Sequence, residues 1–295
     1  MSTLFPGFES RRIRTKSAPG VTINLEIGGD GPPVLLLHGY PETHAMWHKV
    51  APQLAREYTV VCADLRGYGD SSKPRGLPDH SNYSKREMAR DMAEVMESLG
   101  FLGFHVVGHD RGGRVGHRLA RDFPKRVRTL TVLDISPTLK MYQSTRYSFA
   151  RAYWHWFFLI QEAPMPERFL QGHAPWYVLR RLGRGKSGLK HFDRRAIAEY
   201  ARAFKDPRTI HATCEDYRAA ATIDLMHDQK DLARKIRMPL LALWGKQGVI
   251  EALFDCLEDW REVATDVRGR ALACGHFIPE ERPEELVREL RRFLR

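Results

Sequence analysis

Cysteine is scarce in this chain, and its few cysteines lie far apart. The 295 residues contain four, Cys62, Cys214, Cys256 and Cys274, with no C-x-x-C pair among them. Thiolate zinc sites need closely spaced ligands, and disulfide-framed proteins need a much higher cysteine density. We therefore expect free, reduced thiols, and neither a thiolate zinc site nor a disulfide framework.

Long apolar runs are also missing. No stretch remains apolar over the roughly 20 residues that a bilayer-spanning helix needs, and residues 1–20 lack the apolar segment of a signal peptide. These absences predict a cytoplasmic protein with no membrane partner. A length of 295 residues suits one large domain or a domain with a sizeable insertion.

The sequence carries an excess of positive charge but no concentrated basic segment. Its 47 lysines and arginines against 36 acidic residues give a formal net charge of +11. No basic run is interleaved with aromatic residues, as a single-strand nucleic-acid binder requires. We therefore expect no nucleic-acid partner, whereas a positive field of this kind favours a small anionic substrate.

Short apolar runs alternate with helical segments along most of the chain. After a hairpin-like start at 8–15 and 21–27, strands are predicted at 34–37, 58–63, 104–107, 129–133, 240–244 and 270–273. Helical material is predicted around 46–57, and helices are predicted at 84–99, 114–121, near 252–263 and from 283 onwards. This alternation predicts an α/β fold with a mostly parallel central sheet and helices on both faces.

The segment 137–229 departs from that alternation. It is rich in aromatic residues and arginine, its pattern is mainly helical, and it contains no convincing strand. We interpret it as a helical cap domain, inserted into a core domain formed by residues 1–136 and 230–295.

Residues 106–114, Val-Val-Gly-His-Asp-Arg-Gly-Gly-Arg, have the form of a nucleophile elbow, a strand followed by a sharp glycine-rich turn and a helix. The residue at the apex is Asp110, where a serine is usual. A carboxylate is already ionised at pH 7 and can attack a saturated carbon. Asp110 therefore predicts displacement of a leaving group through an ester between enzyme and substrate. The alternative is an ordinary turn aspartate that caps the following helix.

These features resemble the α/β-hydrolase superfamily over essentially the full length of the chain. The matching segments are His-Gly-Tyr-Pro at 38–41, the loop 64–72, the elbow, and Gly-His at 275–276. Within the superfamily, the elbow together with Tyr-Trp-His-Trp at 153–156 is similar to fluoroacetate dehalogenases. The resemblance implies hydrolysis of 2-haloacids such as fluoroacetate or chloroacetate to 2-hydroxyacids, no cofactor and no metal, and a homodimer.

The resemblance also implies a catalytic triad, with Asp110 as nucleophile and His276 as the general base that activates water against the ester. Many members of the fold supply the acid after the next-to-last core strand. Here residues 245–250 contain no carboxylate, and Glu251 is the first one beyond them. The remaining candidate is Asp134, at the end of the strand after the elbow helix, an arrangement similar to that of fluoroacetate dehalogenases. It would orient the imidazole and stabilise its cation.

Two arginines follow the nucleophile closely. Arg111 is expected at the turn and Arg114 in the first helical turn, where both can reach the pocket and bind a carboxylate bidentately. The resemblance assigns both to the substrate carboxylate, which would hold the halogen-bearing carbon in line with Asp110. An arginine on a helix is otherwise most often solvated or paired with an acid.

A departing fluoride requires several donors in a dry pocket, because its charge is concentrated. His155, Trp156 and Tyr217 resemble the halide-binding trio of the family and supply imidazole, indole and phenol donors. The alternative for the aromatic run 151–160 is a buried packing helix.

The ester oxygen also needs donors during hydrolysis. The backbone N–H groups of Tyr40 and Arg111 match the oxyanion hole of the fold. The side chain of Tyr40 is expected to take no necessary part.

The same residues allow two other interpretations. An epoxide hydrolase uses the same Asp, His and acid but opens its substrate with two cap tyrosines, for which Tyr153 and Tyr217 are a candidate pair. Against it, Arg111 has no role with a neutral epoxide. A catalytically silent ligand receptor on the same scaffold is the second alternative, against which an intact triad argues.

Overall fold

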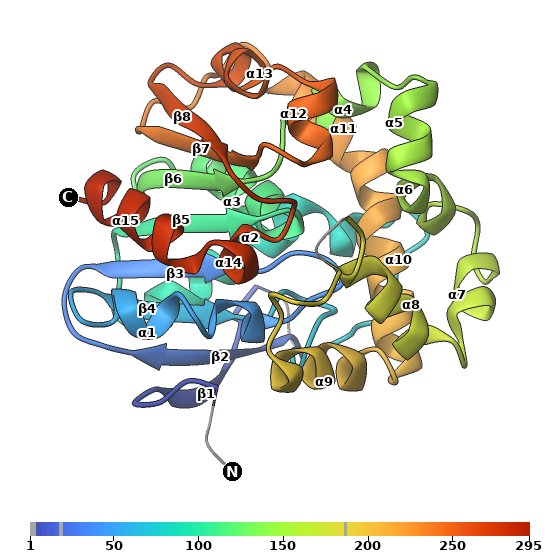
Figure 1. Cartoon of the computed structure of the whole chain (residues 1–295), viewed down its shortest axis with the longest axis horizontal. Helices are drawn as coiled ribbons and strands as arrows, with labels where there is room; N and C mark the ends of the chain where they lie inside the picture. Colours follow the sequence, from blue (N-terminus) through green and yellow to red (C-terminus); the bar gives the residue numbers. More distant parts are fainter. Residues whose placement is uncertain (1–3, 18–19, 186–187) are drawn as a thin grey trace.

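A computed structural model of the protein describes residues 4–17, 20–185 and 188–295. Eight strands form one sheet in the order β1-β2-β4-β3-β5-β6-β7-β8 (Figure 1). They are β1 (Glu9–Arg14), β2 (Thr22–Gly28), β3 (Pro33–Leu37), β4 (Thr59–Ala63), β5 (Phe104–His109), β6 (Val127–Leu133), β7 (Leu240–Gly245) and β8 (Val267–Leu272). The pairs β1–β2 and β2–β4 are antiparallel and all others are parallel. The predicted mostly parallel sheet is confirmed.

Burial differs sharply between the centre and the edge of the sheet. Every residue of β5 is buried, as expected for an apolar run in a parallel sheet that is covered on both faces. β1, at the edge, is mostly exposed and carries three arginines and a glutamate. Charged side chains on an exposed edge strand discourage pairing with another chain.

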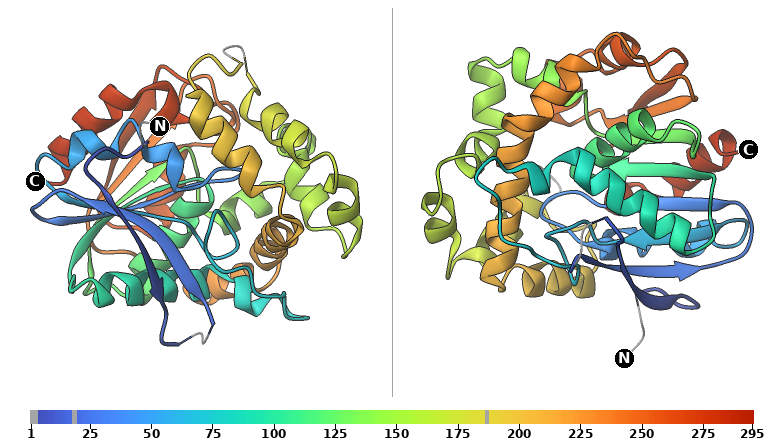
Figure 2. Two further views of the ribbon diagram at one scale, coloured as in Figure 1. Left: turned by 90° about the horizontal axis from the view of Figure 1, so that it is seen from below. Right: turned by 180° about the vertical axis from the view of Figure 1, so that it is seen from behind.

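Helices cover both faces of the sheet. α2 (Lys85–Ser98) and α3 (Arg111–Asp122) lie together on one face, with α3 packed on β5 and β6 (Figure 2, right). α1 (Ala51–Leu54), α14 (Ile278–Glu281) and α15 (Pro283–Phe293) lie on the face turned to the viewer in Figure 1. α13 (Cys256–Val263) packs on β7 and β8. None of the helices in the described ranges combines the length and apolar character needed to cross a bilayer.

The helical material predicted around 46–57 is divided into two short helices. The structure has a short 3-10 helix, η1 (His44–Trp47), and then α1. Pro52 lies in the first turn of α1 and has no backbone N–H for a bond to the carbonyl of residue 48, with which its ring would also clash. A continuous helix therefore cannot run through this segment.

The predicted helix near 252–263 is also divided. It consists of α12 (Val249–Leu253) and α13, separated by Phe254 and Asp255 in extended conformation. The Asp255 carboxylate accepts a hydrogen bond from the Glu258 N–H at 3.1 Å, which caps the start of α13.

Other predicted boundaries agree more closely. Helix 84–99 is confirmed as α2, and Ser84 caps it by accepting a hydrogen bond from the Glu87 N–H at 3.3 Å. The last strand is longer than predicted, because β8 begins at Val267. Its first residues, Val-Arg-Gly-Arg, have an exposed and polar pattern, and pairing with β7 establishes them as a strand.

The described part of the chain between β6 and β7 is helical. It forms α4 (Thr138–Gln143), α5 (Tyr147–Ala152), α6 (Trp154–Leu159), α7 (Met165–Leu170), α8 (Ala174–Leu182), α9 (Arg194–Ala203), α10 (Pro207–Ala221) and α11 (Ile223–Lys230). Helices α6 to α10 lie beyond the carboxyl ends of the central parallel strands (Figure 1). α/β sheets bind their ligands at this edge, so these helices stand where they can cover a site.

Candidate active site

Asp110 lies at the turn between β5 and α3, with φ of 44° and ψ of −110°. Such a conformation costs a non-glycine residue about 1–3 kcal/mol and recurs at functional sites. The turn is tight, since a Cβ at Gly108 would lie 2.5 Å from the Gly112 carbonyl oxygen. The elbow is therefore present, and α3 begins directly after it at Arg111, earlier than the predicted start at residue 114.

The Asp110 carboxylate is buried yet remains ionised. Burial by itself would raise its pKa, but the positive charges of Arg114 and Arg111 oppose that effect, and the pKa lies below the ordinary value. Its Oδ2 accepts a hydrogen bond from the Tyr40 N–H at 3.3 Å. An ionised carboxylate with little water around it is well suited to attack carbon.

His276 and Asp134 meet beside the nucleophile although they are far apart in the chain. His276 lies in the loop between β8 and α14, and Asp134 directly follows β6 with φ of 54°. His276 Nδ1 is 2.5 Å from Asp134 Oδ2. The other carboxylate oxygen, Oδ1, accepts a hydrogen bond from the Gly245 N–H at 2.9 Å. This second bond fixes the carboxylate against the end of β7.

Burial controls the protonation of this pair. It raises the pKa of Asp134 to about 7, and burial together with the nearby Arg184 lowers the pKa of His276 well below its ordinary value. The imidazole is therefore neutral. With Asp134 ionised and accepting the Nδ1 proton, Nε2 keeps a lone pair for a water molecule.

Glu251, the other acid weighed from the sequence, points elsewhere. It lies on the exposed side of α12, where its carboxylate accepts a hydrogen bond from Trp244 Nε1. The carboxylate in contact with His276 is that of Asp134.

Arg111 differs from its expected free, bidentate geometry. Its Nε and Nη2 donate to the two carboxylate oxygens of Asp216 at 2.8 Å each, and Nη2 also reaches the Asp216 carbonyl oxygen. Nη1 is buried and has no partner among the described residues. The guanidinium also lies 4.1 Å from the centre of the Tyr217 ring. Arg111 can therefore offer one nitrogen to a substrate, not a two-nitrogen fork.

Arg114 is likewise partly occupied. Its Nη1 donates to Thr138 Oγ1 at 2.8 Å and to the Ser136 carbonyl at 3.3 Å. Nε is buried and unpartnered within the described ranges, and the guanidinium lies 4.7 Å from the Trp156 ring centre. Arg111 and Arg114 thus have one guanidinium nitrogen each, Nη1 and Nε respectively, without a partner among the described residues.

His155, Trp156 and Tyr217 are brought together from α6 and α10. The His155 and Tyr217 ring centres are 5.9 Å apart, and those of Trp156 and Tyr217 are 6.2 Å apart. His155 Nδ1, Trp156 Nε1 and Tyr217 Oη are buried with no hydrogen-bond partner among the described residues. An unsatisfied buried donor costs about 1–3 kcal/mol. Three of them at one place indicate a missing acceptor or anion.

The Tyr40 side chain has a larger role than expected. Its ring is buried and lies 5.2 Å from the Tyr217 ring centre and 6.3 Å from that of His155. Tyr40 therefore contributes its N–H to the Asp110 carboxylate and its ring to the wall of the pocket. Arg111 is the first residue of α3, where backbone N–H groups lack intrahelical partners.

Asp216 is a functional residue that the sequence analysis missed. Besides Arg111, its carboxylate accepts hydrogen bonds from Tyr68 Oη at 2.7 Å and from Lys85 Nζ. Burial would raise its pKa, but Arg111 and Lys85 hold that pKa far below the ordinary value. An available signal was the acidic pair Glu215-Asp216 on a helix that is otherwise rich in alanine.

Two further arginines near the centre were not predicted as site residues. Arg181 is buried beside His155, and Arg184 lies at the side of a cavity of about 470 Å³ that Phe192 and Phe277 also line, next to His276. Within the described ranges, neither arginine forms an ion pair with a carboxylate, and the same holds for Arg114. The pocket consequently has positive charge available for an anion.

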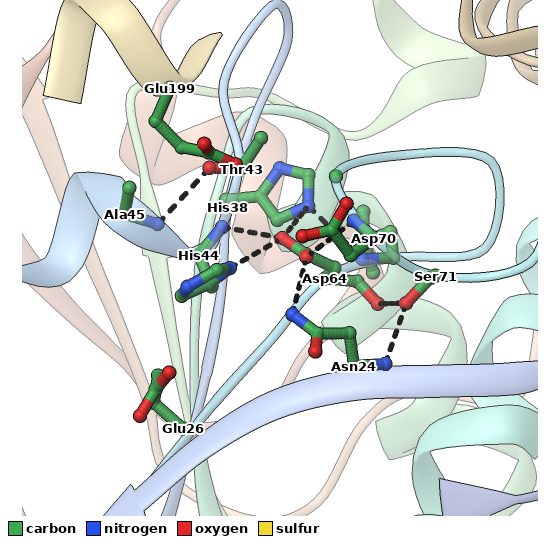
Figure 3. Close-up of polar contacts among 12 residues, drawn as sticks. Asn24, Glu26, His38, Thr43, His44, Ala45, Asp64, Asp70, Ser71 and Glu199 are labelled. Carbon is green, nitrogen blue, oxygen red and sulfur yellow. Dashed lines mark hydrogen bonds and ion pairs between the residues drawn. The ribbon is translucent and has the colours of Figure 1, made fainter. Parts of the chain in front are cut away.

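A second open cavity, of about 740 Å³, lies away from this centre between β2, η1 and α9. At its side the buried Asp64 accepts hydrogen bonds from the His44 N–H at 2.8 Å, Asn24 Nδ2 at 3.0 Å and the Asp70 N–H at 3.0 Å (Figure 3). A Cβ at Gly69 would lie 2.1 Å from that carboxylate. The loop 64–72 is thus ordered around Asp64 and has a structural role.

Metal ligation has no evident place in the site. The described part of the chain contains no group of three or more His, Cys, Asp and Glu side chains arranged to hold an ion. The polar groups around Asp110 are mainly donors and cations, which are suited to an anion.

Comparisons with known proteins agree with this architecture. A family model for the alpha/beta hydrolase fold matches residues 32–283. Fluoroacetate dehalogenase from Burkholderia sp is 48% identical over 293 residues, 99% of this chain and 95% of its own length. Soluble epoxide hydrolase from Corynebacterium sp. (strain C12) is 34% identical over 275 residues, 91% of this chain and 92% of its own. The crystal structure of ALR0039 from Nostoc sp PCC 7120 is 54% identical with a TM-score of 0.95, covering 97% of this chain and 98% of its own.

These full-length matches confirm the family expected from the sequence motifs. The chain belongs to the α/β hydrolase family, in the branch that includes fluoroacetate dehalogenase.

Proposed function

We propose that this protein is a hydrolytic dehalogenase that converts a haloacetate, fluoroacetate or chloroacetate, into glycolate and halide. The observation that carries the proposal is an ionised Asp110 together with three buried donors, on His155, Trp156 and Tyr217, that have no partner among the described residues. A nucleophilic carboxylate and an anion-binding pocket are the two groups that displacement of a halide requires. The 48% identity to a fluoroacetate dehalogenase supports the same conclusion.

In the first step, the substrate carboxylate binds the free guanidinium nitrogens of Arg111 and Arg114. An Asp110 oxygen attacks the halogen-bearing carbon from the side opposite the halogen. A C–O bond forms, the carbon–halogen bond breaks, and the halide leaves with the electron pair. His155, Trp156 and Tyr217 donate to it. The product is an ester on Asp110, with inversion at that carbon.

In the second step, His276 Nε2 removes a proton from water, which attacks the carboxyl carbon of the ester. Negative charge develops on the ester oxygen, where the N–H groups of Tyr40 and Arg111 donate. The glycolate oxygen leaves and takes up the proton from His276, and the new Asp110 carboxyl group releases the remaining proton of the water to solvent, which restores the carboxylate. Asp134 keeps the imidazole oriented and stabilises its transient cation.

The catalytic triad and the halide donors come from different parts of the chain. This supports a core of residues 1–136 and 230–295 and a cap of 137–229. Asp110, Asp134 and His276 come from the core, and the halide donors come from the cap. Helix α11 runs one residue past the expected boundary, to Lys230. A cap of this kind excludes water, which strengthens every electrostatic interaction in the site.

An epoxide hydrolase is the second candidate. Tyr153 and Tyr217 are both buried near Asp110, and one full-length relative is a soluble epoxide hydrolase. A neutral epoxide, however, leaves the excess positive charge of Arg114 and Arg181 without a partner. Haloacetate accounts for these groups better.

The proposal is tested by measuring halide release from fluoroacetate and chloroacetate with the wild type and Asp110→Asn. Release of fluoride by the wild type alone supports cleavage of the carbon–fluorine bond and the assigned nucleophile. Release of chloride without release of fluoride narrows the substrate to chloroacetate. Hydrolysis of styrene oxide with no halide release from either acid overturns the proposal in favour of the epoxide hydrolase.

We also propose that the protein is a homodimer. Trp154, Met165, Phe169 and Trp176, on helices α6 to α8, expose 47%, 42%, 67% and 66% of their surface. Exposed apolar groups gathered on neighbouring helices are typical of protein–protein contacts. Light scattering after size exclusion should give twice the chain mass, and Phe169→Glu with Trp176→Glu should give the monomer.

A cytoplasmic location is part of the same proposal. Cys62, Cys214, Cys256 and Cys274 are all free and buried, which supports a protein that folds in a reducing compartment. Cell fractionation of the producing organism should recover the protein with cytoplasmic markers.

A further inference from the structure

Arg181 is a buried cation with an unusual environment. It lies near the end of α8, 7% exposed, and its Nη2 is 3.1 Å from His155 Nε2. Its Nε is buried without a partner in the described residues. Burial and the charge of Arg184 lower the pKa of Arg181 from its ordinary value. A buried guanidinium with no carboxylate normally destabilises a protein, so its position calls for a function.

The contact with His155 determines where the imidazole carries its proton. A guanidinium can only donate, so Nε2 must be the acceptor. Burial and the charge of Arg181 lower the pKa of His155 well below its ordinary value, and the ring is neutral. A neutral imidazole that accepts at Nε2 carries its hydrogen on Nδ1. Nδ1 is the nitrogen without a partner, and it can then donate.

Without Arg181, the hydrogen could equally lie on Nε2. A lone pair would then stand on Nδ1, in place of the donor proposed for the departing halide, which it would repel. Arg181 is buried beside His155, where few water molecules screen its charge. One residue therefore affects both the direction of the His155 donor and the potential at the halide.

We propose that Arg181 is a positioning residue for halide release: it holds His155 as the Nδ1–H tautomer, so that the ring donates to the leaving halide. This inference rests on the proposed dehalogenase function. Fluoride depends on such donation more than chloride does, because its charge is more concentrated. Arg181 is therefore a determinant of activity toward the carbon–fluorine bond.

Three variants separate this role from a purely structural one. Arg181→Met removes the donor and the charge while keeping a long side chain. Arg181→Lys keeps a charged group that can only donate and should restore the tautomer. Arg180→Met is the matched control, because Arg180 is the exposed neighbour on the same helix. Thermal unfolding of each variant verifies that it is folded.

The first readout is the protonation of His155, measured by nitrogen-15 NMR of histidine-labelled protein and assigned with His155→Gln. Wild type, Arg180→Met and Arg181→Lys should show a protonated Nδ1 and an unprotonated Nε2. Arg181→Met should lose this pattern. Retention of the Nδ1–H tautomer in a folded Arg181→Met protein overturns the inference, and this result does not depend on turnover.

The second readout compares fluoride and chloride release. We expect Arg181→Met to lower fluoride release about 100-fold, the effect of losing one preorganised donor, and chloride release by a smaller factor. Equal losses with both substrates overturn the inference while leaving the proposed function intact. A wild type that releases neither halide overturns the proposed function itself.

Discussion

Arg111 and Asp216 form a buried ion pair that joins the elbow to the inserted helices. Arg111 Nε donates to Asp216 Oδ2, and Nη2 donates to Oδ1, each at 2.8 Å, and both side chains are fully buried. The arginine next to the nucleophile is therefore held by α10. Lys85, from α2, shares the same carboxylate and also lies 3.6 Å from Asp224 Oδ2.

Replacing Asp216 with Asn should strongly destabilise the protein. The change leaves Arg111 buried without its charge partner and Lys85 with Asp224 alone, and breaking a buried pair in this way costs about 3–5 kcal/mol. Urea unfolding of the variant should show a correspondingly lower midpoint. Asp266→Asn, which removes an exposed pair with Arg268, is the control and should unfold like the wild type. Equal midpoints for both variants would contradict the assigned role of Asp216.

His276→Asn should trap the ester intermediate. Asp110 can still displace the halide, but the side chain that activates water has been removed. Intact mass spectrometry should show the protein with one added carboxymethyl group, and one equivalent of halide should appear in solution. The double variant Asp110→Asn/His276→Asn should show neither change. Halide release without an adduct on the single variant would argue against a covalent mechanism.

Asp134→Asn should slow ester hydrolysis much more than ester formation. The imidazole loses the acceptor at 2.5 Å that sets its tautomer, and the corresponding change in other triads lowers the rate about 10³- to 10⁴-fold. Rapid-mixing measurements should therefore show a burst of halide and then slow turnover. Glu251→Gln removes the other candidate acid and should retain near wild-type rates. A large loss of turnover in Glu251→Gln and a small loss in Asp134→Asn would instead assign Glu251 as the acid that supports His276.

The two chemical steps should depend differently on pH. Burial raises the pKa of Asp134 to about 7. Below that pH the protonated acid donates to His276 Nδ1, the neutral ring carries its hydrogen on Nε2, and the base is lost. Hydrolysis of the ester should therefore decline as pH falls through about 7. The pKa of Asp110 lies below its ordinary value, so the first halide burst should stay constant across the neutral range. If the rate of the halide burst also declined as pH fell through about 7, these assignments would be contradicted.

Local sequence pattern was sufficient for much of the core. The elbow could be recognised because an apolar strand, a glycine-rich turn and a helix are adjacent in the chain. The helix beginning after Ser84 was equally visible from its cap. The pattern failed to locate the break before α1, whose first turn contains Pro52, within the helical material predicted around 46–57. It also failed for β8, whose first residues are polar and pair only because β7 lies beside them.

The sequence by itself determined the fold class and the carboxylate that we propose as nucleophile, because both depend on neighbouring residues and on side-chain chemistry. Only the tertiary structure decided which groups are available for catalysis. Asp134 meets His276 across 142 positions, and Asp216 occupies the fork of Arg111 across 105. Contacts over such separations arise from the packing of core and inserted helices. The packing also leaves the donors of His155, Trp156 and Tyr217 unpaired, which no local periodicity encodes.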